Sequence, residues 1–258
     1  MKFIDVHCHL DGDSYGDIPR LMQKIQSAGV QKIIAVGYDM ATSRGAHYLA
    51  EEYGFCYFTA GIHPTEVNKI KDSDLYKINK LLNHPKCVAV GEIGLDYHYP
   101  DTNKEKQREI FLLQLQLAYC RELPVQIHSR DCAEDMLNLL KDNAKLLKYG
   151  ALLHCYSHST EIALELEKLG VCFSFGGTST YSGSKKAKRT IAALKRESIL
   201  TETDSPYLPP KSRAGQFPNT PESIPEILQN IADIRGVTAE EMAEIVWNNA
   251  HRLFKKML

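Results

Sequence analysis

Short apolar runs alternate with amphipathic segments along the whole of this 258-residue chain. There are eight such runs: "KFIDVHCHL", "KIIAVGYD", "CYFTAGIHP", "CVAVGEIGLDY", "PVQIHSRD", "ALLHCYS", "VCFSFGG" and "SILTETDSP". Intervening segments such as "DIPRLMQKIQSAG" and "STEIALELEKLG" carry apolar residues at helical spacing, and several end in Gly. Strands that alternate with helices predict βα units and a parallel sheet, and eight units predict a closed (β/α)8 TIM barrel of the α/β class.

The chain beyond the eighth run predicts two further helices. Residues 220–236 and 237–257 both have helical periodicity, so we expect extra C-terminal helices that close the barrel. Since no linker or low-complexity tract interrupts the pattern, residues 1–258 predict a single domain. A doubly wound open sheet is the alternative, but no G-x-G-x-x-G fingerprint follows the first predicted strand.

Composition limits the partners of this chain. A formal net charge of −1 gives the protein no global attraction for a polyanion, so a nucleic acid would have to be held by a local basic patch or by bound metal. The N-terminus has no signal-peptide pattern, no apolar run reaches the length of a membrane span, and the seven Cys lack disulfide or zinc spacing. We therefore expect a cytoplasmic protein with reduced thiols and no membrane partner. No protein partner is evident, and the oligomeric state stays open.

Nitrogen and oxygen donors end six of the eight runs, and barrel enzymes place their chemistry at the carboxyl ends of strands. In chain order these donors are His7, His9, His63, Glu92, His128, His154 and Asp204. A structural hydrogen bond explains any one of these histidines as well as metal ligation does. The complete set, at the same end of several strands, favours a site for divalent ions such as Zn²⁺, Mn²⁺ or Mg²⁺.

Two ions fit this donor set better than one. Four imidazoles and two carboxylates exceed the roughly three protein ligands of a single catalytic zinc. The two oxygens of Glu92 can reach one ion each, and Asp204 can bind the first ion and also accept a proton from water. Paired ions lower the pKa of a water molecule and neutralise an oxyanion, which predicts hydrolysis with Glu92 and Asp204 as the catalytic residues.

Taken together, the donor segments closely resemble the TatD family of metal-dependent hydrolases, a TIM-barrel branch of the amidohydrolase superfamily. The resemblance extends from end to end through "DVHCHL", "GIHP", "VGEIGLDY", "QIHSRD", "LLHCYS" and "LTETDSPYL", followed by "NTPE" and "NNAHRLF". It implies that His7, His9, Glu92 and Asp204 hold one metal ion and that Glu92, His128 and His154 hold the other. His63 and Arg130 match family positions that line the site for substrate.

The resemblance implies deoxyribonuclease activity, including 3′ to 5′ exonuclease action on single strands, so single-stranded DNA is the expected substrate. An aminoacyl-tRNA deacylase or another ester or amide hydrolase is the alternative enzyme, and a non-catalytic metal-binding scaffold is a third. Two positions depart from the family pattern: Cys132 stands where Ala is common, and His158 where many members carry Gly. His158 could contact phosphate or narrow the cleft, but we favour a cap on the following helix.

A basic segment, three aromatic residues and two carboxylates outside the donor set also need an interpretation. The basic segment 185–196 could contact a phosphate backbone, although a solvated helix face is the preferred reading. Tyr181, Tyr207 and Phe217 lie in predicted loops at the active end and could stack on bases or simply pack the loops. Asp5 and Glu202 precede donor positions inside the barrel, so we expect each to have a cationic or hydrogen-bonding partner.

Overall fold

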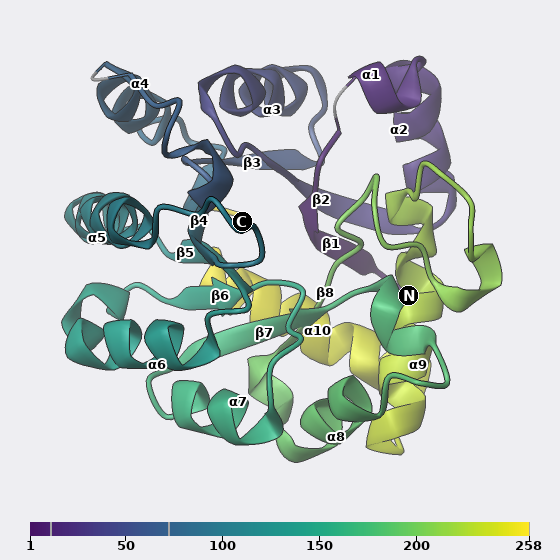
Figure 1. Ribbon diagram of the computed structural model, residues 1–258. Coiled ribbons are helices and arrows are strands. Elements are labelled where there is room, and N and C mark those ends of the chain that lie inside the picture. The colour runs from purple at the N-terminus through teal and green to yellow at the C-terminus, as the bar shows by residue number, and fades with distance from the viewer. Residues whose placement is uncertain (11, 72, 258) are drawn as a thin grey trace.

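The computed structural model describes residues 1–10, 12–71 and 73–257, and its eight strands form one parallel sheet in the order β1 to β8. Figure 1 shows the strands as a ring with helices outside it, which confirms the predicted (β/α)8 barrel. Each apolar run corresponds to one strand, although β2 begins two residues before its run. The strands are β1 Phe3–Cys8, β2 Val30–Val36, β3 Cys56–Ala60, β4 Cys87–Asp96, β5 Val125–Arg130, β6 Ala151–Leu153, β7 Val171–Phe175 and β8 Ile199–Thr201.

Helices follow the strands and cover the outside of the ring. The α-helices are α1 Gly12–Tyr15, α2 Ile18–Ser27, α3 Met40–Glu52, α4 Asp74–Leu81, α5 Lys104–Cys120, α6 Ala133–Asp142, α7 Thr160–Glu167, α8 Lys185–Ala193, α9 Ile224–Arg235 and α10 Ala239–Leu253. Short 3₁₀ helices are η1 Pro64–Glu66, η2 Ala144–Leu147, η3 Gly177–Thr180, η4 Arg196–Ser198, η5 Lys211–Arg213 and η6 Pro221–Ser223.

Local sequence signals determine where several helices begin. The side chain of Asp17 accepts a hydrogen bond from Arg20 N at the start of α2, and that of Thr238 accepts one from Glu241 N at the start of α10. Such caps satisfy amide groups that the first turn of a helix leaves unpaired. These two side chains therefore help to set where α2 and α10 begin.

The seam between β8 and β1 is held largely by side chains and by the loops that follow the two strands. Thr201 Oγ1 donates to Ile4 O over 2.8 Å, and Thr203 donates to the carboxylate of Asp5 from both its backbone N (3.1 Å) and its Oγ1 (2.5 Å). Beyond the strands, Asp204 N donates to His7 O over 3.0 Å. The first and last strands are therefore linked at the point where both carry predicted metal ligands.

The two C-terminal helices complete the barrel, as the sequence predicts. On α10, Asn249 Nδ2 donates to Ile199 O at the start of β8 over 2.9 Å, so this helix covers the end of the barrel where the strands begin. The other end, where the strands finish, is left for the loops. All seven Cys are free thiols. Within the described part of the chain, no helix combines the length and apolar character needed to cross a bilayer.

Candidate metal centre

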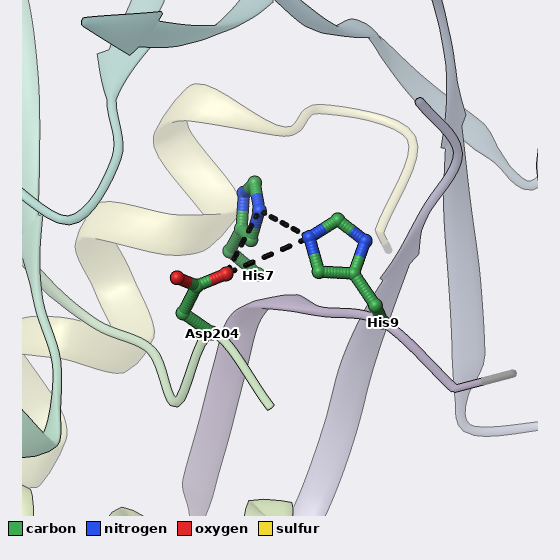
Figure 2. A group of neighbouring side chains, drawn as sticks. All are labelled: His7, His9 and Asp204. Atoms are coloured by element: carbon green, nitrogen blue, oxygen red, sulfur yellow. Dashed lines mark hydrogen bonds and ion pairs between the residues drawn. The ribbon is translucent and has the colours of Figure 1, made fainter. Parts of the chain in front are cut away.

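Six side chains, from five strands or the residues that directly follow them, converge on one point, and we call them the donor cluster: His7, His9, Glu92, His128, His154 and Asp204. Figure 2 shows the β1 half, where the two imidazoles and the carboxylate of Asp204 point toward one another. His7 Nε2 lies 3.3 Å from His9 Nε2, and Asp204 Oδ1 lies 3.8 and 3.5 Å from these two nitrogens. Glu92 Oε2 completes this half at 3.5 Å from both nitrogens.

The other oxygen of Glu92 faces a second set of imidazoles. Glu92 Oε1 lies 2.8 Å from His154 Nε2 and 3.0 Å from His128 Nδ1, and these two nitrogens are 3.3 Å apart. His63 Nε2 is 3.4 Å from the same oxygen. Glu92 therefore lies between two groups of donors, with one oxygen toward each.

His63 and Arg130 lie in different positions relative to the cluster. His63 was expected to line the site for substrate, and its ring is close enough to Glu92 and His128 to belong to the second donor group. Arg130, at the end of β5, is exposed and lines the cleft above the donors.

The groups that face the Nδ1 atoms of His7 and His9 determine which ring nitrogen carries the proton. His9 Nδ1 lies 3.1 Å from Val36 O, which can only accept. His7 Nδ1 lies 2.9 Å from Gln126 Oε1, and the amide nitrogen of Gln126 is already used to donate to Val6 O. In the neutral rings the proton therefore lies on Nδ1, and both inward Nε2 atoms present lone pairs.

The second pair of imidazoles is oriented by buried carboxylates. Asp96 Oδ2 lies 3.0 Å from His128 Nε2, so His128 Nδ1 presents its lone pair to Glu92. His154 Nδ1 faces Glu202 Oε2 over 3.8 Å and has no hydrogen-bond partner among the described residues. A small shift of either side chain would bring this pair into contact.

This arrangement of acceptors fits a bound cation. When the rings are neutral, lone pairs and carboxylate oxygens face one another with no donor between them, which is unfavourable unless a positive charge lies among them. Ligands about 2.0–2.2 Å from a tetrahedral zinc lie about 3.3–3.6 Å from one another. The Nε2 atoms of His7 and His9 are 3.3 Å apart, and each lies 3.5–3.8 Å from the facing oxygens of Glu92 and Asp204.

The pKa shifts of the cluster also indicate that a positive charge stabilises it. Burial by itself raises the pKa of Glu92, but His154, His63 and His128 outweigh it and hold this pKa well below its usual range. Burial lowers the pKa of His9, yet Asp204 and Glu92 raise it to about 9. Since a divalent ion can supply the charge that protons otherwise bring, the cluster is suited to metal binding.

Strand β4 differs in length from the prediction. Glu92 was expected to end its strand, but β4 continues to Asp96, so Glu92 lies within the strand. The continuation requires Gly94, whose φ is +145° and where a Cβ would lie 2.0 Å from His128 O. The longer strand places Asp96 behind His128.

The sequence analysis did not predict that Asp96 and Gln126 contact the imidazoles of the donor cluster. Each lies an even number of positions from a predicted ligand on its own strand, Asp96 four after Glu92 and Gln126 two before His128. Strand parity puts residues at such spacings on one face, so this signal was available in the sequence.

The donor cluster lies at the bottom of an open cleft of about 760 Å³. Residues at its walls include Tyr38, Tyr99, Ser129, Arg130, Tyr207 and Leu208. The ring of Tyr38 approaches that of His9 edge-on, with centroids 5.6 Å apart. A substrate in this cleft can reach the donor cluster from solvent.

Asp5 and Glu202 both have the hydrogen-bonding partners that were expected. Asp5 is bound by Thr203 and by His7 N, and burial raises its pKa to about 8. Glu202 accepts from Ser174 Oγ over 2.6 Å through one oxygen, while its Oε1 has no partner among the described residues. Burial also raises the pKa of Glu202, to about 7.

The prediction that His158 caps a helix is wrong. Ser159 is the N-cap of α7, and its side chain accepts from Ile162 N over 3.3 Å. His158 Nε2 instead lies 2.7 Å from Ser129 Oγ, at the wall of the cleft. The shorter Ser side chain reaches the amides of the first turn directly, which leaves the imidazole to turn toward β5.

The basic segment 185–196 is divided between two environments. Arg189 and Arg196 pair with Glu161 and Glu241 on neighbouring helices, 3.1 and 2.8 Å away, which agrees with a solvated helix face. Lys185 and Lys186 are exposed at the start of α8. Neither lysine lines the cleft.

The chain is similar to a family model, to several relatives and to solved structures, and these comparisons agree with one another. A family model described as "TatD related DNase" matches residues 4–255. The chain is 36% identical to the uncharacterized metal-dependent hydrolase YabD of Bacillus subtilis, over 97% of this chain and 98% of that protein. The crystal structure of the TatD homologue YjjV from Escherichia coli has a TM-score of 0.92 and 36% identity, with 98% of each chain covered. A TatD-family hydrolase from Entamoeba histolytica, at 23% identity and a TM-score of 0.87, shares the fold.

Proposed function

The chain belongs to the TatD family of metal-dependent hydrolases, and from this premise we propose that it cleaves phosphodiester bonds in DNA with two divalent ions. The observation that carries the proposal is the position of Glu92, whose two oxygens face two separate groups of donor side chains. One ion would be held by His7, His9, Glu92 and Asp204. The other would be held by Glu92, His128 and His154, with His63 close enough to join them.

Paired divalent ions in such a site activate water as a nucleophile and neutralise charge that develops on the leaving oxygen. The chain itself supplies a base. Asp204 is buried except for about 15% of its side chain, and His9 helps to hold its pKa below the usual value although burial acts in the opposite direction. An ionised carboxylate at the cleft floor can accept the proton of the attacking water.

Arg130 is the residue of the cleft best suited to a phosphate. Its guanidinium is exposed at the end of β5 and presents several donors to the space above the donor cluster. The formal net charge of the chain is only −1, so local contacts of this kind must hold a polyanionic substrate. We propose single-stranded DNA as the substrate and 3′ to 5′ exonuclease action as the mode of cleavage.

Ester or amide hydrolysis, including deacylation of aminoacyl-tRNA, is the alternative reaction for the same site. A carboxylic ester needs the same activated water and the same neutralisation of an oxyanion. Substrate selection in the cleft would separate the two reactions.

The proposal is tested by one assay series with purified protein, stripped of metal and reloaded with Zn²⁺, Mn²⁺ or Mg²⁺. The substrates are a 5′-labelled single-stranded oligonucleotide, its duplex, an aminoacyl-tRNA and p-nitrophenyl acetate. We expect a ladder of products that shortens from the 3′ end, and loss of this activity by at least 100-fold in Glu92→Ala and Asp204→Ala. Glu165→Gln, an exposed carboxylate of α7, is the matched control and should cleave as the wild type does.

The other outcomes discriminate among the alternatives. Robust ester or aminoacyl-tRNA turnover without DNA cleavage would identify the alternative reaction. Failure of every substrate with all three ions, in protein that binds metal, would identify a binding scaffold instead of an enzyme.

A further inference from the structure

We propose that the rim of the cleft carries two stacking surfaces for unpaired nucleobases, one formed by Tyr99 and the other by the ring pair Tyr207–Phe217. Tyr99 follows β4 and Tyr207 follows β8, so the two surfaces lie on opposite sides of the eight-stranded ring. Both tyrosines line the cleft that leads to the donor cluster. This inference rests on the proposed function, and it explains why the protein would act on single-stranded DNA.

More than half of the surface of each of the three residues is exposed. Tyr99 is 53% exposed, Tyr207 57% and Phe217 65%. A single exposed ring is ordinary, but Tyr99 and Tyr207 line the same cleft, and Phe217 extends the surface that Tyr207 presents. The exposed faces can accept any base, because every base has a π-face.

The Tyr207–Phe217 surface is held in place by its loop. The two ring centroids are 6.3 Å apart, at an interplanar angle of 44°. Asn219, two residues after Phe217, is buried, and its Nδ2 donates to Tyr207 O over 2.9 Å and to Thr203 O over 3.2 Å. Asn219 N also donates to Pro206 O over 2.8 Å. The rings therefore project from a fixed backbone, which reduces the entropy that binding would cost.

A second set of contacts supports the same loop from below. A Cβ on Gly177 would lie 2.3 Å from Leu208 O, so the loop packs directly on this glycine. The hydroxyl of Tyr181 donates to Pro209 O over 3.1 Å. Tyr181 is half-buried and braces the loop, so it is not one of the stacking rings.

On the opposite side, Tyr99 lies next to Arg130, the side chain that we propose as the phosphate contact. The guanidinium of Arg130 is 6.0 Å from the centroid of its ring. The backbone carbonyl of Arg130 also accepts from Tyr97 N over 2.9 Å, which ties the loop after β4 to the end of β5. A base on Tyr99 would therefore have its phosphate beside Arg130.

Only an unpaired strand can use these surfaces. In a duplex each base is covered above and below by its neighbours and its faces are not available. A strand that crosses the cleft from Tyr99 to Tyr207 must turn its bases outward onto the rings, with the phosphates toward the donor cluster. Stacking on an aromatic side chain strengthens binding by about tenfold or more for each base.

The test uses metal-loaded Tyr99→Ala, Tyr207→Ala and Phe217→Ala proteins, with two substrates. We expect KM for a single-stranded oligonucleotide to rise about tenfold in each variant. Turnover of bis(p-nitrophenyl) phosphate, which cannot span the cleft, should stay within twofold of the wild type. Tyr99→Phe should keep the wild-type KM, because it retains the ring.

Tyr76→Ala is the matched control, since Tyr76 is 61% exposed on α4 and does not line the cleft. It should leave both activities unchanged. An unchanged oligonucleotide KM in all three alanine variants would overturn the inference, as would an equal loss on both substrates.

A binding measurement separates this inference from the proposed function. Oligonucleotides with 2-aminopurine near the 3′ end should lose fluorescence on binding to the wild type and regain it in the alanine variants. Quenching in a wild type that cleaves no DNA would support the stacking surfaces and reject the nuclease proposal. Cleavage with the same quenching in every variant would reject the stacking surfaces alone, and absence of both binding and cleavage would reject both.

Discussion

The imidazole of His128 is oriented by a single buried carboxylate, that of Asp96, and this contact controls which nitrogen faces Glu92. We predict that Asp96→Asn weakens binding of one metal ion by about 10–100-fold, because a neutral amide no longer raises the basicity of the ring. The measurement is competition for Zn²⁺ with a chelating dye. Asp142→Asn, an exposed carboxylate at the end of α6, should have no effect on either ion.

Unchanged metal binding in Asp96→Asn would contradict this prediction. Two ions bound by Asp96→Asn with wild-type affinity would show that the packing of the ring orients His128 without help from Asp96.

At the scale of elements, the seam between β1 and β8 depends on Thr203. We predict that Thr203→Val lowers the free energy of unfolding by about 1–3 kcal/mol, because the shape is kept while the carboxyl of Asp5 loses a hydroxyl donor. Urea denaturation followed by circular dichroism measures the change. Ser27→Ala, which removes one exposed hydrogen bond on α2, is the control and should change the value by less than about 0.5 kcal/mol.

The start of α7 gives a second prediction at this scale. We predict that Ser159→Ala lowers the free energy of unfolding by about 1 kcal/mol, whereas Ser159→Asp keeps it, because a carboxylate also accepts from the amides of the first turn. Both values come from the same urea experiment. Equal losses in the two variants would show that the cap does not account for the stability of this helix start.

At the scale of the whole molecule, metal binding should stabilise the fold. Free ion at about 1,000 times its Kd contributes about 4 kcal/mol, and about 2–4 °C per kcal/mol is typical of a chain of this size, so we predict that removal of metal lowers Tm by roughly 8–16 °C. Scanning calorimetry with and without a chelator measures the shift. The double variant Glu92→Gln, Asp204→Asn should melt at the same temperature in both conditions.

Much of the fold could be predicted because the signals are local. Alternation of short apolar runs with helical periodicity located all eight strands and predicted the two C-terminal helices. The end of β4 was misplaced because its continuation to Asp96 depends on pairing with β5, and Gly94 is opposite His128 in that pairing. Such pairing is a contact between distant segments and leaves no local pattern.

The sequence predicted that the donor side chains lie near one another, but not which contacts they make. Parity and position at strand ends brought the donors to one end of the barrel. They could not show that His63 approaches Glu92, or that His158 turns to Ser129 instead of capping a helix.

The amino-acid sequence by itself therefore determined the barrel and the end of it at which the donors gather, because strand parity and helical periodicity are properties of neighbouring residues. Only the tertiary structure decided which acceptor lies behind each imidazole and which aromatic rings stay exposed at the rim. Those contacts join residues from different strands and loops, such as Asp96 with His128 and Tyr207 with Phe217. Their distances are set by how the strands register and how the ring closes, which no local stretch of the chain encodes.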